Sequence, residues 1–303
     1  MNTQDSGWTR VQLHYSRPEV LDEVIRFSNG RWIGIHTSAR MKDGRPILLR
    51  YFEKRPLKAE DVEGLKLLLN RFRRLGPRTI YATANVYARL EDEYDVKSPE
   101  NVIACMPTWD IDNSLQGWRA TVDAGREIYA FLESQGVRSV ILKWSGNGMH
   151  VHVHHNAFSL ELYREKHPLD IAYAVVEYVR RKLATRFEDI REMRDCRELT
   201  VDNEMDPQRL FTAPLSLHRE LDLVAVVINP DEIDSFEPSF ANADNFRHFR
   251  GWDSASSGEA DGLAEEALKI VGGYPLWSYP QTRRRGKRIE DEIRKFQYKL
   301  GDI

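Results

Sequence analysis

The stretch Val102-Ile-Ala-Cys-Met-Pro-Thr-Trp-Asp-Ile-Asp112 is mostly apolar and ends with two aspartates one residue apart. Such a run predicts a buried strand, and because strand side chains alternate, Asp110 and Asp112 are expected on the same face. Adjacent carboxylates raise each other's pKa unless a cation separates them, so the pair is a candidate ligand set for Mg²⁺ or Mn²⁺. The alternative is an ordinary strand that enters a turn, with Asp112 capping the next helix.

The next segments predict a helix and a hairpin. Residues 117–135 place apolar side chains at helical spacing and stop at Gly136. Residues 137–144 form a strand, and residues 149–154 alternate as the return strand. His150, His152 and His154 therefore share one face of the hairpin.

A glycine-containing turn joins the two hairpin strands. Its glycines permit positive φ angles and leave backbone N–H groups exposed. It is interpreted either as an ordinary hairpin turn or, beside an acidic pair, as a cradle for phosphate oxygens. The turn consists of Ser145, Gly146, Asn147 and Gly148.

Composition limits the class of protein. A chain of 303 residues with 41% hydrophobic content can bury one large core or two small ones. No apolar run approaches a membrane span and the N-terminus lacks the pattern of a signal peptide, so a cytoplasmic protein without membrane contact is expected. With only Cys105 and Cys196, neither a disulfide framework nor a cysteine-rich zinc or iron–sulfur site is expected. A net charge of −3 means that nucleic acid must be held by local basic patches.

The first 100 residues predict an α/β element that packs on the central part. A helix is expected at residues 18–27, a hairpin at residues 32–52, an amphipathic helix at residues 59–74 and a strand at residues 79–88. A basic cluster ends the second helix and is either a solvated helix end or a contact to a phosphate backbone. The cluster consists of Arg71, Arg73 and Arg74.

Residues 102–202 predict the order strand, helix, strand, strand, helix, strand. The second helix is expected from Pro168 to Phe187 and the last strand at residues 198–202. This is the order of the ferredoxin-like or RNA-recognition-like split motif, so the fold class is α+β. In that motif the third strand lies antiparallel to the first, beside it, and the fourth flanks its other side. Asp110 and Asp112 should then lie next to His150, with Asp202 as a third carboxylate.

The C-terminal part carries fewer signals. After a strand at residues 223–228, residues 231–262 are acidic and rich in Ser and Ala, and a loosely structured surface segment is expected there. The predicted organisation is an N-terminal element at residues 1–100, a catalytic core at 101–230, an acidic and mixed segment at 231–280 and a basic tail helix at 281–303. The tail is interpreted as a solvated extension or a nucleic-acid clamp built from Arg283, Arg284, Arg285, Lys287 and Arg288.

Four motifs in order carry a family resemblance. They are Asp110-Ile-Asp112, Ser145-Gly-Asn-Gly-Met-His150, Val201-Asp202 and Arg209-Leu-Phe-Thr-Ala-Pro-Leu-Ser-Leu-His218. The set resembles that of the archaeo-eukaryotic primase superfamily, which includes primase small subunits, primase-polymerases and the polymerase domain of bacterial ligase D. The motifs span residues 102–228, about the middle third of the chain or more.

The resemblance implies a DNA primase or other template-dependent nucleotidyltransferase that uses two divalent metals, Mg²⁺ or Mn²⁺. Its partners would be nucleoside triphosphates, single-stranded or primed DNA and a replication or repair protein. Asp110, Asp112 and Asp202 match the catalytic, metal-binding aspartates. The nucleotide contacts would be Ser145, Gly146, Asn147, Gly148, His150, Arg209, Ser216 and His218, with Lys143 as a further positive donor.

Two features depart from the superfamily's pattern. Thr212 stands where many relatives place a basic residue, and the cysteine-bearing zinc element of replicative primases is absent. A primase-polymerase or an end-joining polymerase therefore fits better than a replicative small subunit.

Two other functions stay open at the level of sequence. His150-Val-His152 also resembles the metal-binding pair of rolling-circle replication endonucleases, in which Tyr173 or Tyr178 would be the nucleophile. A catalytically inactive subunit that binds nucleotide or DNA is the other alternative.

Overall fold

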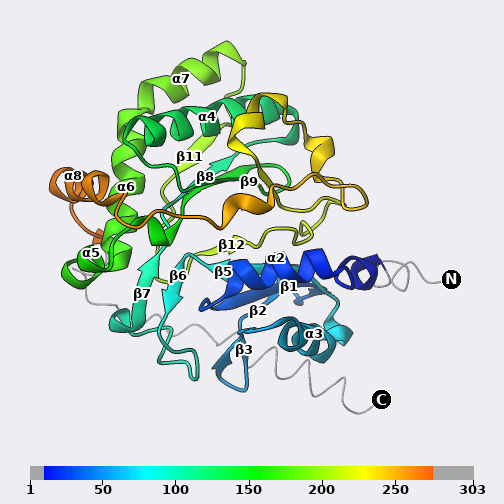
Figure 1. The fold of residues 1–303 in the computed structure, drawn as a ribbon. Helices are drawn as coiled ribbons and strands as arrows, with labels where there is room; N and C mark the ends of the chain where they lie inside the picture. Colours follow the sequence, from blue (N-terminus) through cyan, green and yellow to red (C-terminus); the bar gives the residue numbers. More distant parts are fainter. Residues whose placement is uncertain (1–9, 276–303) are drawn as a thin grey trace.

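The computed structural model describes residues 10–275 and consists of helices and two main antiparallel sheets (Figure 1). The larger sheet has the order β11-β8-β10-β9-β13 and the smaller has the order β12-β5-β1-β2. The strands of the larger sheet are β8 (Thr108–Asp112), β9 (Val140–Trp144), β10 (Met149–Val153), β11 (Thr200–Asp202) and β13 (Val226–Ile228). Those of the smaller sheet are β1 (Ile33–Arg40), β2 (Pro46–Leu49), β5 (Pro77–Thr83) and β12 (Leu210–Thr212).

The larger sheet has a helix-covered face and a polar face. The helices α4 (Trp118–Ser134) and α6 (Pro168–Lys182) cover the first, where the Trp109 indole donates a 3.0 Å hydrogen bond to the Val176 carbonyl of α6. Since side chains alternate, Asp110 points to the opposite face. Its Cα partners across the sheet are His150 and Asp202, which confirms the expected juxtaposition.

The polar face of the larger sheet meets the N-terminal part of the chain. Helix α2 (Pro18–Ser28) lies between the two sheets in Figure 1, packs against β5, and places the ring of Phe27 beside His152. Strand β12 belongs to the smaller sheet although it follows β11, so the chain crosses from one sheet to the other and returns at β13. One continuous hydrophobic core therefore joins the two sheets.

Two expected elements are interrupted. The predicted strand 102–112 is two strands, because β7 (Val102–Cys105) pairs with β6 (Asn85–Tyr87) and only β8 enters the larger sheet. Pro107 stands at the break, where it cannot donate a ladder hydrogen bond. The helix expected through Phe187 ends at Lys182, and α7 (Ala184–Met193) begins after Leu183.

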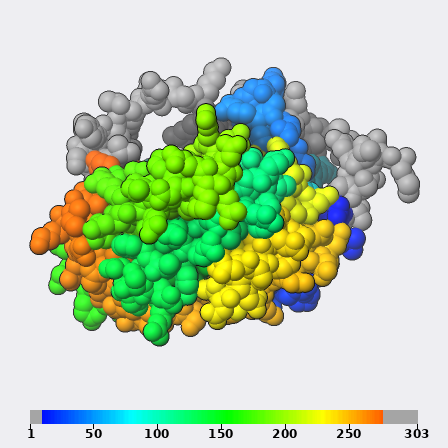
Figure 2. Space-filling view, turned by 90° about the horizontal axis from the view of Figure 1, so that it is seen from above, coloured from blue at the N-terminus to red at the C-terminus, as the bar shows by residue number. Residues whose placement is uncertain are grey.

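The expectation of a loosely structured segment at residues 231–262 was wrong. Three 3-10 helices occupy it, and Ile233, Phe236 and Trp252 are buried in the core. Figure 2 shows this segment, in yellow and orange, packed beside α4. Because it is anchored by scattered aromatic residues rather than by a periodic apolar stripe, sequence periodicity did not show it.

The remaining elements connect these layers. They are α3 (Val62–Arg71), α5 (Leu160–Glu165), α8 (Asp261–Val271), β3 (Tyr51–Phe52), β4 (Arg55–Pro56) and the 3-10 helices η1 (Arg73–Leu75), η2 (Pro99–Asn101), η3 (Leu115–Gly117), η4 (His155–Ala157), η5 (Pro230–Ser235), η6 (Pro238–Ala241) and η7 (Arg250–Trp252). Between residues 10 and 275, no helix is both long and apolar enough to cross a membrane.

Candidate functional site

Three aspartates lie on the polar face of the larger sheet. Asp110 is buried in β8, with strands on both sides, whereas Asp112 and Asp202 are exposed where β8 ends and β11 ends. Asp110 is therefore an interior residue of the sheet, and Asp112 is the carboxylate that stands at the strand end.

The pKa values of the first two aspartates shift in opposite directions. Burial opposes ionisation of Asp110, but His150 and Arg209 outweigh it and lower the pKa of this carboxyl. Asp112 has no such close donor, so burial and then the charges of Asp110 and Asp202 raise its pKa. The negative charge of Asp112, at the exposed end of the site, is thus not balanced by a neighbouring cation as that of Asp110 is.

The carboxylates meet the needs of a divalent metal only in part. Among residues 10–275, no three acidic, histidine or cysteine side chains are grouped closely enough to hold a metal ion by themselves. Mg²⁺, however, is commonly bound by one or two carboxylates together with the phosphates of a substrate. Asp112 with Asp110 and Asp202 beside it fits that arrangement, and these carboxylates would be the protein ligands.

Arg209 links the two sheets at this point. It precedes β12 of the smaller sheet, and its Nη2 donates a 2.5 Å hydrogen bond to Oδ2 of Asp110 in the larger one. It also forms an ion pair with Glu204. The sequence motif indicated Arg209 but not Glu204, because the contact depends on the loop that joins β11 to β12.

The glycine turn is fitted against β8 and His218. Ser145 N–H donates to the Gly148 carbonyl at 2.9 Å, and Gly146 has φ +128°. A Cβ atom at Gly148 would lie 2.5 Å from the Ile111 carbonyl oxygen, and one at Gly146 would lie 2.6 Å from Cδ2 of His218. Both positions therefore require glycine, because neighbouring atoms come too close for a Cβ atom. This close approach places the turn beside β8, the strand that carries Asp110 and Asp112.

We expect Gly148→Ala to lower the free energy of unfolding by about 1–3 kcal/mol, because the backbone of β8 must move to admit the methyl group. Urea unfolding measures this loss, and Gly262→Ala is the control, since a Cβ there meets no atom within 4 Å. Equal stabilities of the two variants would show that the turn does not contact β8 closely.

The two motif histidines lie next to the turn. His150 is buried, with Nε2 3.3 Å from Oδ1 of Asp110, and burial lowers its pKa although Asp110 opposes the shift. His218 packs against Gly146, and its Nδ1 accepts the amide hydrogens of Glu220 and Leu221. Burial, followed by the charge of Arg219, lowers the pKa of His218. Both imidazoles thus favour the neutral form, which can donate one hydrogen bond.

Two predicted nucleotide contacts lie inside the protein. Lys143 is fully buried, its Nζ stands 4.2 Å from the centre of the Phe27 ring, and that atom has no hydrogen-bond partner among the described residues. Burial sets its pKa well below the usual value. The Ser216 hydroxyl is also buried and accepts the Ile80 amide at 2.7 Å. The structure therefore does not support Ser216 as a nucleotide contact, since its hydroxyl oxygen is hydrogen-bonded to the backbone of the smaller sheet.

The predicted basic cluster at the end of the second helix is engaged away from this site. Arg71 lies over the Phe52 ring at 4.1 Å, and Arg73 and Arg74 belong to η1. The tail cluster 283–288 lies outside the described residues.

The tyrosines of the endonuclease hypothesis lie on the wrong face of the sheet. Tyr173 and Tyr178 belong to α6, which covers the face opposite His150 and His152. Tyr178 is buried and donates a hydrogen bond to Glu266. Neither phenol can therefore act together with the histidine pair.

Comparisons with known proteins support the fold. No protein-family model matches the sequence, and no curated protein matches it. Among solved structures, the chain is similar to the polymerase domain of Mycobacterium tuberculosis ligase D in complex with DNA, with 15% sequence identity and a TM-score of 0.51. The match covers 89% of this chain and 91% of that one. The chain therefore has a polymerase-like α+β fold.

Proposed function

We propose that this protein is a template-dependent nucleotidyltransferase of the primase-polymerase type. One observation carries the proposal. Asp110, Asp202 and His150 lie together on one face of the larger sheet, and Arg209, from the smaller sheet, forms a hydrogen bond with Asp110. The order β11-β8-β10-β9 supports a ferredoxin-like core, since it is the order expected for its fourth, first, third and second strands. The similarity to a ligase D polymerase domain solved with DNA adds to this.

The residues divide the chemistry between them. Asp110, Asp112 and Asp202 hold negative charge where the metal ions and the attacking 3′-hydroxyl must meet. These carboxylates would hold two Mg²⁺ or Mn²⁺ ions, which would supply activation of that hydroxyl and neutralisation of the leaving pyrophosphate. The N–H groups of residues 145–148 and the side chains of His218 and Arg209 bind and orient the triphosphate. Arg209 changes partner from Asp110 to a phosphate as the nucleotide enters.

The test is incubation with a single-stranded template, with and without a primer, with ribo- or deoxyribonucleotides and Mg²⁺ or Mn²⁺. We expect incorporation that follows the template sequence and stops when EDTA is added. Products without a primer would identify a primase, and products only with one would identify a gap-filling polymerase. Nucleotide and DNA binding without any incorporation would instead support the inactive subunit.

His218→Ala should raise the KM for nucleotide about tenfold or more, because it removes a hydrogen-bond donor beside the turn. His150→Ala should act in the same direction. Steady-state kinetics measures the change, and fluorescence anisotropy of labelled single-stranded DNA without nucleotide is the control. An equal loss of DNA affinity would contradict a role in triphosphate binding.

A further inference from the structure

A broad cavity of about 800 Å³ lies over the smaller sheet, next to the site. Arg209 lines it, as do His36 and Tyr81 from neighbouring strands. No local sequence pattern indicates this cavity, because its lining residues come from segments that are far apart in the chain, among them β1, β5, the loop before β12 and the loop after His218.

Rings and aliphatic side chains line the cavity beside its arginines. They include His36, Tyr81, Leu48 and Leu210. The His36 ring is edge-on to Tyr81, with centroids 5.2 Å apart and a 3.0 Å hydrogen bond between Nδ1 and the phenol oxygen. Burial, and then Arg219, lowers the pKa of His36 to about 4, so this imidazole is neutral at neutral pH. Neutral rings in the wall of a cavity suit the stacking of planar groups.

Arg50 adds a planar cation to one wall. Its guanidinium carbon lies 3.6 Å from the centre of the Trp32 ring, and its Nη2 donates to the Gln208 carbonyl at 3.0 Å. Nε of Arg50 is buried and has no hydrogen-bond partner among residues 10–275. The guanidinium therefore stacks on the Trp32 ring, which is itself only 1% exposed. Arg50 lines the cavity.

The charges that line the cavity are mostly positive, which favours a polyanion. Arg50, Arg209 and Arg219 line it together with one carboxylate, Asp206, and of these arginines Arg209 is already paired with Asp110 and Glu204. The Arg219 side chain is 47% exposed, and its ionic partner Glu220 is distant, at 3.9 Å. Arg50 and Arg219 come from different segments of the chain, which suits a backbone with repeated phosphates.

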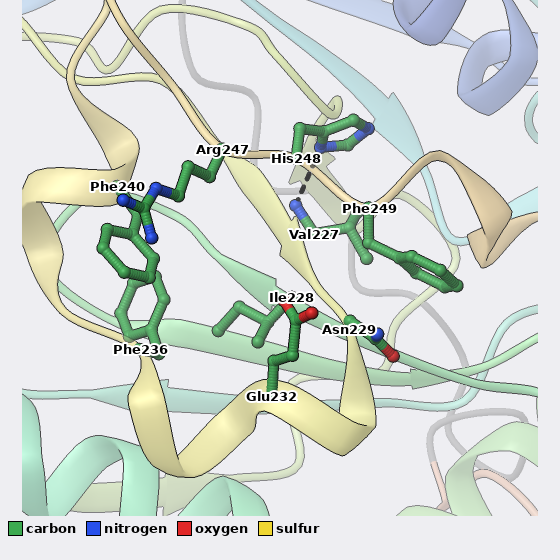
Figure 3. A pocket seen from close by; sticks show the side chains of 9 residues that line it. All are labelled: Val227, Ile228, Asn229, Glu232, Phe236, Phe240, Arg247, His248 and Phe249. Atoms are coloured by element: carbon green, nitrogen blue, oxygen red, sulfur yellow. Dashed lines mark hydrogen bonds between the residues drawn. The ribbon is translucent and has the colours of Figure 1, made fainter.

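A second cavity, at the outer edge of the larger sheet, is smaller and lies away from the site (Figure 3). It measures about 210 Å³ and lies along β13, three strands or about 14 Å from β8. Its Arg247 lies over the Phe240 ring at 4.1 Å, and Glu232 lines the same cavity. Arg247 is therefore a stacked arginine that matches Arg50 but stands away from the site.

We propose that the cavity over the smaller sheet binds a single strand of DNA, with a base stacked on the Arg50–Trp32 pair and a backbone phosphate held by Arg219. This rests on the proposed function, because the strand would be the template that passes the aspartates. Stacking on rings and guanidinium planes accepts any base, as a template site must.

The experiment measures anisotropy of a fluorescein-labelled single-stranded oligonucleotide in EDTA without nucleotide. Arg50→Ala should weaken binding about tenfold, the usual effect of losing one stacked base. Arg50→Lys should not restore the affinity, since lysine keeps the charge but not the plane. Arg219→Ala should flatten the slope of log K against log salt by about 0.7, the value for one phosphate on a single strand. Arg247→Ala should leave affinity and slope unchanged.

A second measurement separates this proposal from the proposed function. Each variant is assayed for nucleotide binding without DNA, and thermal unfolding confirms that it is folded. Unchanged DNA affinity in both Arg50→Ala and Arg219→Ala would overturn the strand site while leaving metal-dependent incorporation by the wild type intact. Loss of nucleotide binding with normal DNA binding would overturn it too, and would assign the cavity to the incoming nucleoside.

Discussion

Asp112→Ala should reduce nucleotide incorporation about a hundredfold or more, the usual effect of losing one electrostatic contact to a transition state. Asp112 is the cleaner test than Asp110, because it is exposed at the strand end, whereas Asp110 is buried and hydrogen-bonded to Arg209. Single-turnover extension of a primed template gives the rate. Glu198→Ala, at an exposed glutamate just before β11, is the control for a lost surface carboxylate.

The same substitution should leave the fold intact or stabilise it. In the folded chain the partial loss of water around Asp112, and then the charges of Asp110 and Asp202, raise the pKa of this carboxyl, so its ionised form is unfavourable there. The native state then binds more protons than the unfolded chain just above the usual aspartate pKa, and stability falls as pH rises through that window. Removing Asp112 should abolish this fall. A variant that is both inactive and less stable by several kcal/mol would indicate a structural role instead.

Glu23→Ala should cost about 3–5 kcal/mol of stability, the usual penalty for breaking a buried ion pair. Glu23 of α2 is 0% exposed and accepts hydrogen bonds from the Trp252 indole at 2.5 Å and from His248 at 3.1 Å. Arg26 and Arg250 complete the cluster, which joins α2 to the segment before α8. Loss of the carboxylate leaves the buried Trp252 indole and His248 imidazole without their acceptor.

Urea unfolding measures that loss, with Glu19→Ala on the exposed side of α2 as the control, where a change within about 0.5 kcal/mol is expected. Burial opposes ionisation of Glu23, but His248, Trp252 and Arg26 outweigh it and lower its pKa. Its contribution is therefore present above the unfolded pKa and lost as pH falls through the lowered value. A Glu23→Ala variant as stable as Glu19→Ala would mean that the C-terminal segment is held by its apolar contacts alone.

The sequence predicted the register of the site well, because period-two alternation and element order determine it. Asp110 lies opposite His150 and Asp202 as expected. The alternation of side chains does not show, however, how deeply each side chain is buried. It could not distinguish exposed Asp112 from buried Asp110, or show that Lys143, two residues before the turn, is covered by Phe27.

Contacts between the two sheets could not be predicted from local sequence patterns. Arg209 reaches Asp110 only because β12 joins the smaller sheet while β11 and β13 join the larger one. The Arg50–Trp32 pair and the buried Glu23 likewise depend on segments distant in sequence. Only the break at Pro107 had a local signal, since proline interrupts a strand ladder.

Binding of Mn²⁺ with a nucleoside triphosphate tests the account most directly, because the aspartates and the turn are proposed to hold them together. Electron paramagnetic resonance measures free Mn²⁺ as protein is added, with and without a non-hydrolysable triphosphate analogue and in the absence of DNA. We expect Mn²⁺ binding that is strengthened by the analogue and lost in Asp112→Ala. Mn²⁺ and analogue binding that is identical in wild type and Asp112→Ala would contradict it.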